Sequence, residues 1–131
     1  MEPMKKFYGK ELILDLHKCD ASLFTRESLK QYFIELCALI DMKREKLVWW
    51  DDLGLPPEEQ EVEPHLKGTT AIQFIKTSNI TIHTLDIMKH AYINIFSCKD
   101  FDPEAAEDFT KKWFKGQVIH SAVINREKRK F

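Results

Sequence analysis

Three closely spaced runs in the second half of the chain alternate apolar and polar residues in the pattern of β-strands. They are TTAIQFIK (69–76), NITIHTLD (79–86) and AYINIFSC (91–98). Only short polar segments separate one run from the next, so the chain has to reverse direction sharply between them. The pattern predicts an antiparallel meander over residues 69–98.

Three further segments have strand character. In ELILDLHKC (11–19), Leu12, Leu14 and Leu16 alternate with Glu11, Ile13 and Asp15. This period of two is expected of a strand with one buried face. QVIHSAVINRE (117–127) is predicted as the last strand, and REKLVWWDD (44–52) is a short aromatic and β-branched run. The prolines and acidic residues of GLPPEEQEVEPH (54–65) predict a loop without a regular element.

Two segments have the apolar period of a helix. TRESLKQYFIELCALID (25–41) begins with Thr25 as the N-cap, and its apolar face is formed by Leu29, Phe33, Leu36, Cys37 and Ile40. A second helix is predicted over about 103–115, because Asp102-Pro103-Glu104 is a strong start signal and Gly116 a stop signal. Within it, Phe109 and Trp113 form an apolar i, i+4 pair.

Two helices and five or six strands in this order predict an α+β fold, a two-layer sandwich with a mostly antiparallel sheet and both helices on one face. The other face of the sheet also needs cover, because both alternating sets of residues in ELILDL contain apolar side chains. A second copy of the chain would supply that cover. We therefore expect a homodimer in an αββα arrangement with the helices outside.

Composition narrows the class of protein. The chain of 131 residues is 44% hydrophobic and carries a net charge of −1, which predicts one domain over 1–131 and no broad cationic surface for nucleic acid or membrane. No apolar segment reaches the length of a membrane span, so a cytoplasmic location is expected. Three cysteines without C-x-x-C spacing argue against disulfides and structural zinc, and the five histidines show no metal-ligand spacing. Cys19 and Cys37 are expected to be packing residues.

The polar tripeptide Thr77-Ser78-Asn79 interrupts the strand runs, and it can be read simply as a turn. His83 can likewise be read as a packed histidine, and Cys98 as a small buried apolar residue. Each residue, taken separately, is explained by a structural role of this kind. The spacing between the serine, the histidine and the cysteine is the feature that suggests chemistry.

Together the spacings resemble the cleavage site of the small prokaryotic S-adenosylmethionine decarboxylases, in which a serine precedes an Ile-His-Thr histidine by five residues and a cysteine by twenty. Ser78, His83 and Cys98 stand at these offsets (83 − 78 = 5; 98 − 78 = 20), and Thr70 stands where the family has a hydroxyl residue. GKELILDLHKCD (9–20) and DPEAA (102–106) also resemble the family. The resemblance extends over about 9–116 and is weakest at 41–67.

This resemblance implies that the chain cuts its own backbone at Thr77-Ser78, giving residues 1–77 and 78–131. The Ser78 hydroxyl would attack the Thr77 carbonyl, His83 would remove the α-proton as general base, and Thr70 would orient these groups or stabilise the oxyanion. Ser78 would become a pyruvoyl group, an electron sink comparable to pyridoxal phosphate, so no external cofactor is needed. Cys98 would return a proton to the substrate α-carbon, because a thiol with a pKa of about 8.5 is mostly protonated at neutral pH.

The chain also departs from the family's pattern. Thr77 and Asn79 stand where the family has glutamate and histidine, and Thr84-Leu85-Asp86-Ile87 replaces Thr-Trp-Pro-Glu, whose glutamate looks like the ribose ligand. PHLKG (64–68) replaces an aromatic-x-Pro-x-Gly segment. Asp86 is the candidate substitute for the ribose ligand. Candidates for stacking on adenine, with core packing as the alternative role, are Trp49, Trp50 and Phe74.

Three functions follow from this pattern. The first is pyruvoyl-dependent decarboxylation of S-adenosylmethionine, which supplies the aminopropyl donor for spermidine. The resemblance implies a homodimer for this function, and shared active sites are a feature of the family that the sequence itself leaves open. The second is decarboxylation of ornithine or arginine, for which the acidic segment 58–63 would favour a cationic substrate. The third is an uncleaved homologue that acts as an interaction partner.

Overall fold

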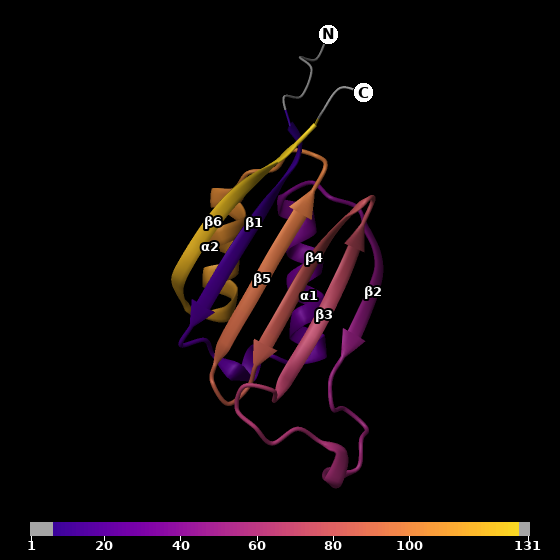
Figure 1. Cartoon of the computed structure of the whole chain (residues 1–131), viewed down its shortest axis with the longest axis vertical. Helices are drawn as coiled ribbons and strands as arrows, with labels where there is room; N and C mark the ends of the chain where they lie inside the picture. Colours follow the sequence, from indigo (N-terminus) through magenta and orange to yellow (C-terminus); the bar gives the residue numbers. More distant parts are fainter. Residues whose placement is uncertain (1–6, 129–131) are drawn as a thin grey trace.

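The computed structural model describes residues 7–128, which form one six-stranded antiparallel sheet with two helices against one of its faces (Figure 1). The elements are β1 (Phe7–His17), α1 (Arg26–Leu39), β2 (Arg44–Trp50), β3 (Gly68–Ile75), β4 (Ser78–Leu85), β5 (His90–Ser97), α2 (Pro103–Phe114) and β6 (Gln117–Glu127). The predicted α+β two-layer sandwich is therefore confirmed. The dimer remains a prediction.

The strands lie in the order β2-β3-β4-β5-β1-β6, and each pairs antiparallel with its neighbours. The predicted meander is β3-β4-β5, in the centre of the sheet. β1 lies beside β5, and β6 forms the edge beyond it, opposite the edge strand β2. This order brings the end of β5 next to the turn between β3 and β4.

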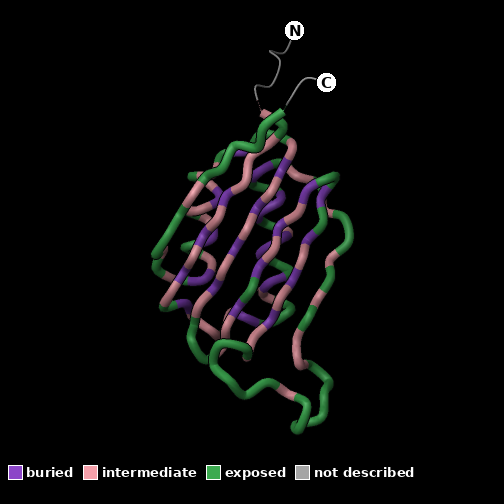
Figure 2. The backbone as a smooth tube through the Cα atoms, viewed as in Figure 1, coloured by how far each residue is buried: buried purple, intermediate pink, exposed green. Residues whose placement is uncertain are grey.

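The core lies between the sheet and the helices. Figure 2 shows buried positions alternating with more exposed ones along the central strands, as the period of a strand requires. The sheet side of the core contains Leu12, Leu14, Leu16, Ile80, Ile82, Ile93 and Ile95, and the helix side contains Leu29, Phe33, Leu36 and Phe114. The two helices meet through Tyr32, whose buried hydroxyl lies 2.7 Å from Thr110 Oγ1.

No helix among residues 7–128 is long and apolar enough to cross a membrane. Both helices have the polar caps that their sequences indicate. Thr25 accepts a hydrogen bond from the Ser28 backbone N–H, and Asp102 accepts from Glu104 and Ala105. The helix starts predicted at these two caps are confirmed.

No helix formed by residues 7–128 covers the second face of the sheet, and we call it the open face. It carries the alternate residues of each strand, including one lateral row of paired residues: Trp50, Thr70, His83, Tyr92, Asp15 and His120. Side chains on this face are partly exposed, and among the large apolar ones are Val48, Phe74 and Ile124, at 39%, 41% and 44%. The open face is the surface that the predicted second copy would cover.

Several predicted boundaries were wrong. The turn between β3 and β4 consists of Lys76 and Thr77 alone, so Ser78 and Asn79 belong to β4. β1 spans Phe7–His17 rather than 11–19, because its pairing with β6 extends it toward the N-terminus. The proline-rich loop contains a single 3₁₀ turn, Pro57–Glu59.

α2 ends at Phe114, within a residue of the predicted end before the stop signal Gly116. Lys115, with φ of 52°, takes the left-handed conformation that glycine most often adopts at a helix end. Gly116 is required for another reason: a Cβ atom there would lie 2.7 Å from the sulfur of Cys19. The glycine therefore allows β6 to pass close to the segment that follows β1.

Candidate active site

The turn between β3 and β4 is strained at Thr77. Its φ of 53° is left-handed, a conformation that β-branched residues rarely adopt and that costs roughly 1–3 kcal/mol. Lys76 is not among the described residues with positive φ, so this is not a type I′ turn, in which both central residues have positive φ. The strain is thus concentrated on the residue whose carbonyl group precedes Ser78.

Ser78 and Cys98 contact each other beside this turn. The Ser78 side chain is buried at 6% exposure, its Oγ accepts a hydrogen bond from the Cys98 backbone N–H at 3.1 Å, and it lies 3.7 Å from the Cys98 sulfur. Thr77 Oγ1 is 3.1 Å from the same sulfur. Antiparallel pairing of β4 with β5 brings these two residues, twenty positions apart in sequence (98 − 78), into contact.

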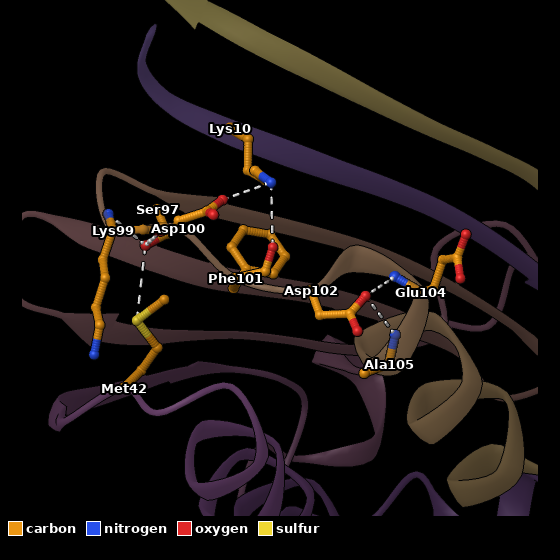
Figure 3. A network of polar contacts seen from close by, with 9 residues as sticks. All are labelled: Lys10, Met42, Ser97, Lys99, Asp100, Phe101, Asp102, Glu104 and Ala105. Carbon is orange, nitrogen blue, oxygen red and sulfur yellow. Dashed lines mark hydrogen bonds and ion pairs between the residues drawn. The ribbon is translucent and has the colours of Figure 1, made fainter. Parts of the chain in front are cut away.

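Polar contacts around Ser97, Lys99 and Asp100 hold the segment that follows β5 (Figure 3). Ser97 Oγ donates to the Lys99 carbonyl at 2.7 Å and accepts from the Lys99 N–H at 3.0 Å, which closes the backbone around Cys98. Lys10 of β1 forms an ion pair with Asp100 at 2.6 Å. Cys98 is therefore held between the end of β5 and a segment anchored to β1.

Thr70 and His83 form a second pair, on the open face. They are directly opposite each other in β3 and β4, and Thr70 Oγ1 lies 2.8 Å from His83 Nδ1. Trp50, the neighbour of Thr70 in β2, is 80% exposed. These three side chains line a cavity of about 500 Å³ whose other wall is the loop 51–66 with Glu59, Glu61 and His65.

The two pairs do not meet within one chain. Ser78 shares its face of β4 with the buried Ile80 and Ile82, whereas His83 is an odd number of positions away and lies on the open face. Five residues of strand also separate them by about 17 Å. Sequence spacing therefore singled out the candidate residues of both pairs without showing that the pairs lie in different parts of the sheet.

Asp86 lies at the Thr70–His83 end of the sheet. Its backbone N–H donates to the Lys67 carbonyl, and its Oδ1 is buried without a hydrogen-bond partner among the residues that the structure describes. Burial raises the pKa of Asp86, and the nearby carboxylates of Asp52 and Asp51 raise it further against the opposing charge of Lys67. All four residues line a cavity of about 420 Å³ that adjoins the start of β3.

The three aromatic candidates have different surroundings. Trp49 lies on the helix side of the sheet, partly buried, with the Arg26 guanidinium 5.6 Å from its ring. Trp50 faces the cavity beside His83. Phe74 lies near the turn, where it lines a smaller cavity of about 280 Å³ together with Ser78 and Phe96. Packing explains Trp49, and only the other two are available to a ligand.

The other two cysteines behave as core residues. Burial raises the pKa of Cys19 and of Cys37 to about 11, so both thiols stay neutral at physiological pH. Both side chains are almost completely buried, which confirms the packing role predicted for them. Across residues 7–128, no three side chains of histidine, cysteine, aspartate or glutamate are grouped to hold a metal ion.

Sequence reasoning missed the lysines around the turn. Lys43, Lys76 and Lys99 line a cavity of about 410 Å³ together with Thr77 and Cys98. They come from three separate segments, and no local motif links them. Lys76 and Lys99 are adjacent in sequence to the predicted site residues Thr77 and Cys98, whereas Lys43 is close to none of them.

Comparison with known proteins gives consistent matches. The family model of S-adenosylmethionine decarboxylase matches residues 10–127. The S-adenosylmethionine decarboxylase proenzymes of Pyrococcus horikoshii and Pyrococcus abyssi are each 30% identical to the chain over 60 residues. That region is 45% of this chain and 43% of each relative, so the match spans less than half the length of the relatives.

Among solved structures, the crystal structure of the adenosylmethionine decarboxylase from Aquifex aeolicus VF5 has the same fold. The two structures superpose with a TM-score of 0.74 over 96% of each chain, at 18% sequence identity. The likeness therefore covers both layers of the sandwich and the whole sheet.

Proposed function

Because the chain belongs to the S-adenosylmethionine decarboxylase family, we propose that it cleaves itself between Thr77 and Ser78 and then decarboxylates S-adenosylmethionine to supply the aminopropyl donor for spermidine. The observation that carries this proposal is the contact of Ser78 with Cys98 directly after the left-handed Thr77. A nucleophile, an acid and a strained peptide unit thus lie together where β4 begins and β5 ends.

Cleavage begins with attack of Ser78 Oγ on the carbonyl carbon of Thr77. The peptide C–N bond breaks, an ester links Thr77 to the Ser78 side chain, and the α-amine of Ser78 is released. Removal of the Ser78 α-proton then breaks the Cβ–O bond and frees the Thr77 carboxylate. Water replaces the remaining nitrogen as ammonia, which leaves a pyruvoyl group at residue 78.

The surroundings of residue 78 fit such a group. The site is buried, and the N–H of Cys98 already donates to the oxygen of Ser78. A pyruvoyl group supplies a ketone that withdraws electrons from the amine of an amino-acid substrate, so no other cofactor is needed. Cys98, whose sulfur is 3.7 Å from Ser78 Oγ, is the residue that gives a proton to the substrate α-carbon.

The proposal assigns Thr70 and His83 to the turn of a second copy. Removal of the α-proton needs a base, and in one chain His83 lies on the open face, away from Ser78. If the open faces of two copies pack with their strands reversed, the His83 end of one sheet lies over the turn of the other. Exposed apolar side chains on this face, Val48, Phe74 and Ile124, support such a homodimer.

Substrate recognition is proposed for the cavity beside His83. Trp50 presents an exposed ring there for stacking on adenine, and the buried, unpartnered oxygen of Asp86 in the adjoining cavity is a candidate ligand for a hydroxyl group. The carboxylates of Glu59 and Glu61 in the same loop favour a second candidate function, decarboxylation of the cationic amino acids ornithine or arginine.

Mass spectrometry of the denatured protein tests cleavage. The expected result is two chains, 1–77 and 78–131, from the wild type and one chain from Ser78→Ala. A wild-type chain that stays whole after prolonged incubation, or a Ser78→Ala chain that splits, would overturn the proposal and favour the uncleaved interaction partner.

Release of labelled CO₂ decides the substrate. S-adenosylmethionine is expected to be decarboxylated, and faster release from ornithine or arginine would replace it with the second candidate. The Cys98→Ala variant should still cleave, since the thiol acts after cleavage. Its turnover should fall by roughly 10²–10⁴, the usual contribution of a positioned acid.

A further inference from the structure

The cavity of about 410 Å³ beside Thr77 and Cys98 contains an excess of positive charge. Its charged side chains are Lys43, Lys76, Lys99 and Asp41. Lys99 is compensated, because its Nζ lies 2.7 Å from Asp41 Oδ2 and 2.7 Å from the Asp41 carbonyl oxygen. Two lysines remain in the cavity after this pairing.

Lys43 and Lys76 have no anionic partner among residues 7–128. They come from different elements: Lys43 precedes β2, and Lys76 is the first residue of the turn. The fold thus places two lysines without an anionic partner among the described residues at a cavity that the proposed acid, Cys98, also lines. Such a cavity favours an anion.

We propose that Lys43 and Lys76 form a carboxylate site beside Cys98. The inference deepens the proposed function and rests on it. Two carboxylates reach this site in the proposed reaction, and both have the same chemistry. One is the α-carboxylate of the amino-acid substrate, and the other is the carboxylate of Thr77 that cleavage releases.

Each source has a geometric reason. Cys98 protonates the substrate α-carbon, so the carboxylate, one bond from that carbon, has to enter the space next to the thiol. Thr77 is itself part of the cavity wall, so its new carboxylate arises within the cavity. In the first case the lysines offset the negative charge of the bound substrate. In the second they offset the charge that cleavage creates at Thr77.

The first arm of the test compares ligands with and without a carboxylate. Lys43→Ala, Lys76→Ala and the double variant are measured beside Lys46→Ala, an exposed lysine of β2 outside the cavity. If the substrate is the source, KM for S-adenosylmethionine should rise roughly tenfold in the double variant. The inhibition constant of the decarboxylated amine should not change, and Lys→Arg substitutions should restore KM.

The second arm compares the cleaved protein with the uncleaved Ser78→Ala protein. If Thr77 is the source, the double lysine variant should lower the Tm of the cleaved protein by about 3 °C and leave that of the Ser78→Ala protein unchanged. Lys46→Ala should move neither Tm.

The outcomes separate this inference from the proposed function. A change in either arm establishes the site and identifies its source. A wild type that cleaves and turns over, with both arms unchanged in the lysine variants, overturns the carboxylate site alone. A wild type that remains whole in the initial mass spectrum overturns the proposed function and the site with it.

Discussion

At the scale of single residues, Thr77 combines strain with a reactive neighbour. A left-handed φ of 53° raises the energy of the intact turn, and the adjoining Ser78 hydroxyl is held by the N–H of Cys98. Opening the peptide bond frees Thr77 from that conformation. The strain therefore favours the cleaved state without requiring any further residue.

Thr77→Gly should slow cleavage roughly tenfold, because glycine adopts positive φ without the steric cost and the intact turn becomes more stable. The rate is read from the decay of the intact chain by mass spectrometry. Thr77→Ala is the matched control: it removes the same hydroxyl but keeps the strain, so it should cleave faster than Thr77→Gly. Equal rates for the two variants would show that strain does not contribute.

Asp86→Asn should stabilise the protein at pH 7. Burial raises the pKa of Asp86, so the folded state favours the protonated carboxyl, and ionisation costs stability as pH rises from the unfolded pKa of about 3.9 through the folded value. The gain should be under about 1 kcal/mol, since much of the side chain is screened by solvent.

The gain from Asp86→Asn should shrink as pH falls toward 4, which denaturant titrations at several pH values will measure. A stability difference that is independent of pH would show that ionisation of Asp86 does not destabilise the folded state. Loss of substrate binding in the same variant, at unchanged cleavage, would support Asp86 as a substrate ligand.

The sequence predicts the identity of these residues better than their grouping. Ser78, His83 and Cys98 are identified by spacing, and antiparallel pairing explains why Ser78 meets Cys98. Because side chains alternate along a strand, the odd offset of five places His83 on the other face from Ser78. The motif gives the offset but not the strand that both residues share. Lys43 carries no local signal at all.

At the scale of elements, the strand pairing around Cys98 depends on Gly9 in β1. A Cβ atom at this position would overlap the carbonyl oxygen of Ser97 and lie 2.9 Å from the Cα atom of Cys98. Only a residue without a side chain lets β1 approach the end of β5 this closely. The glycine thus sets the position of the thiol from a neighbouring strand.

Gly9→Ala should therefore displace Cys98 and lower the free energy of unfolding by about 1–3 kcal/mol. The rate at which iodoacetamide alkylates Cys98 should then differ from that of the parent protein, in either direction. The measurement uses the Ser78→Ala background, in which the chain stays whole. Gly116→Ala is the control, since its Cβ atom would press on Cys19 instead. It should lower stability and leave the alkylation rate of Cys98 unchanged; an unchanged rate in Gly9→Ala would remove the positioning role.

Element boundaries show what a local pattern lacks. The alternation in TTAIQFIK and NITIHTLD predicts both strands, but their pairing decides that the turn contains only Lys76 and Thr77. At the end of α2, Gly116 was the predicted stop signal, whereas Lys115 takes the left-handed conformation and the glycine serves close packing. Tertiary contacts fixed both outcomes, and they are not encoded in neighbouring residues.

At the scale of the whole molecule, the sheet separates the two candidate pairs. Ser78 and Cys98 lie at the turn, while Thr70 and His83 lie on the open face toward the loop 51–66. The helices cover one face, and the open face keeps partly exposed apolar side chains. Two copies packed through this face would join the pair of one chain to the turn of the other, so dimerisation would be a condition of cleavage.

Subunit complementation tests this arrangement. His83→Ala alone should stall at the ester, which hydroxylamine detects by severing the chain, and Ser78→Ala alone should stay intact. When both variants are co-expressed, a mixed dimer pairs an intact Ser78 with an intact His83 from the other copy. The His83→Ala chains in such dimers should then cleave fully, and mass labels on each variant will show which chain was cut.

The control is co-expression of His83→Ala with a double variant, Ser78→Ala and His83→Ala, which supplies no base and should rescue nothing. At random pairing with excess Ser78→Ala, most His83→Ala chains gain a competent partner, so the cleaved fraction should rise with the expression ratio. Cleavage of His83→Ala with every partner would show that His83 is not the base. Failure of Ser78→Ala to rescue His83→Ala would place the base within its own chain. Ser78 and His83 of one chain would then have to approach each other through a rearrangement of the sheet, which the core packing of Ile80 and Ile82 opposes.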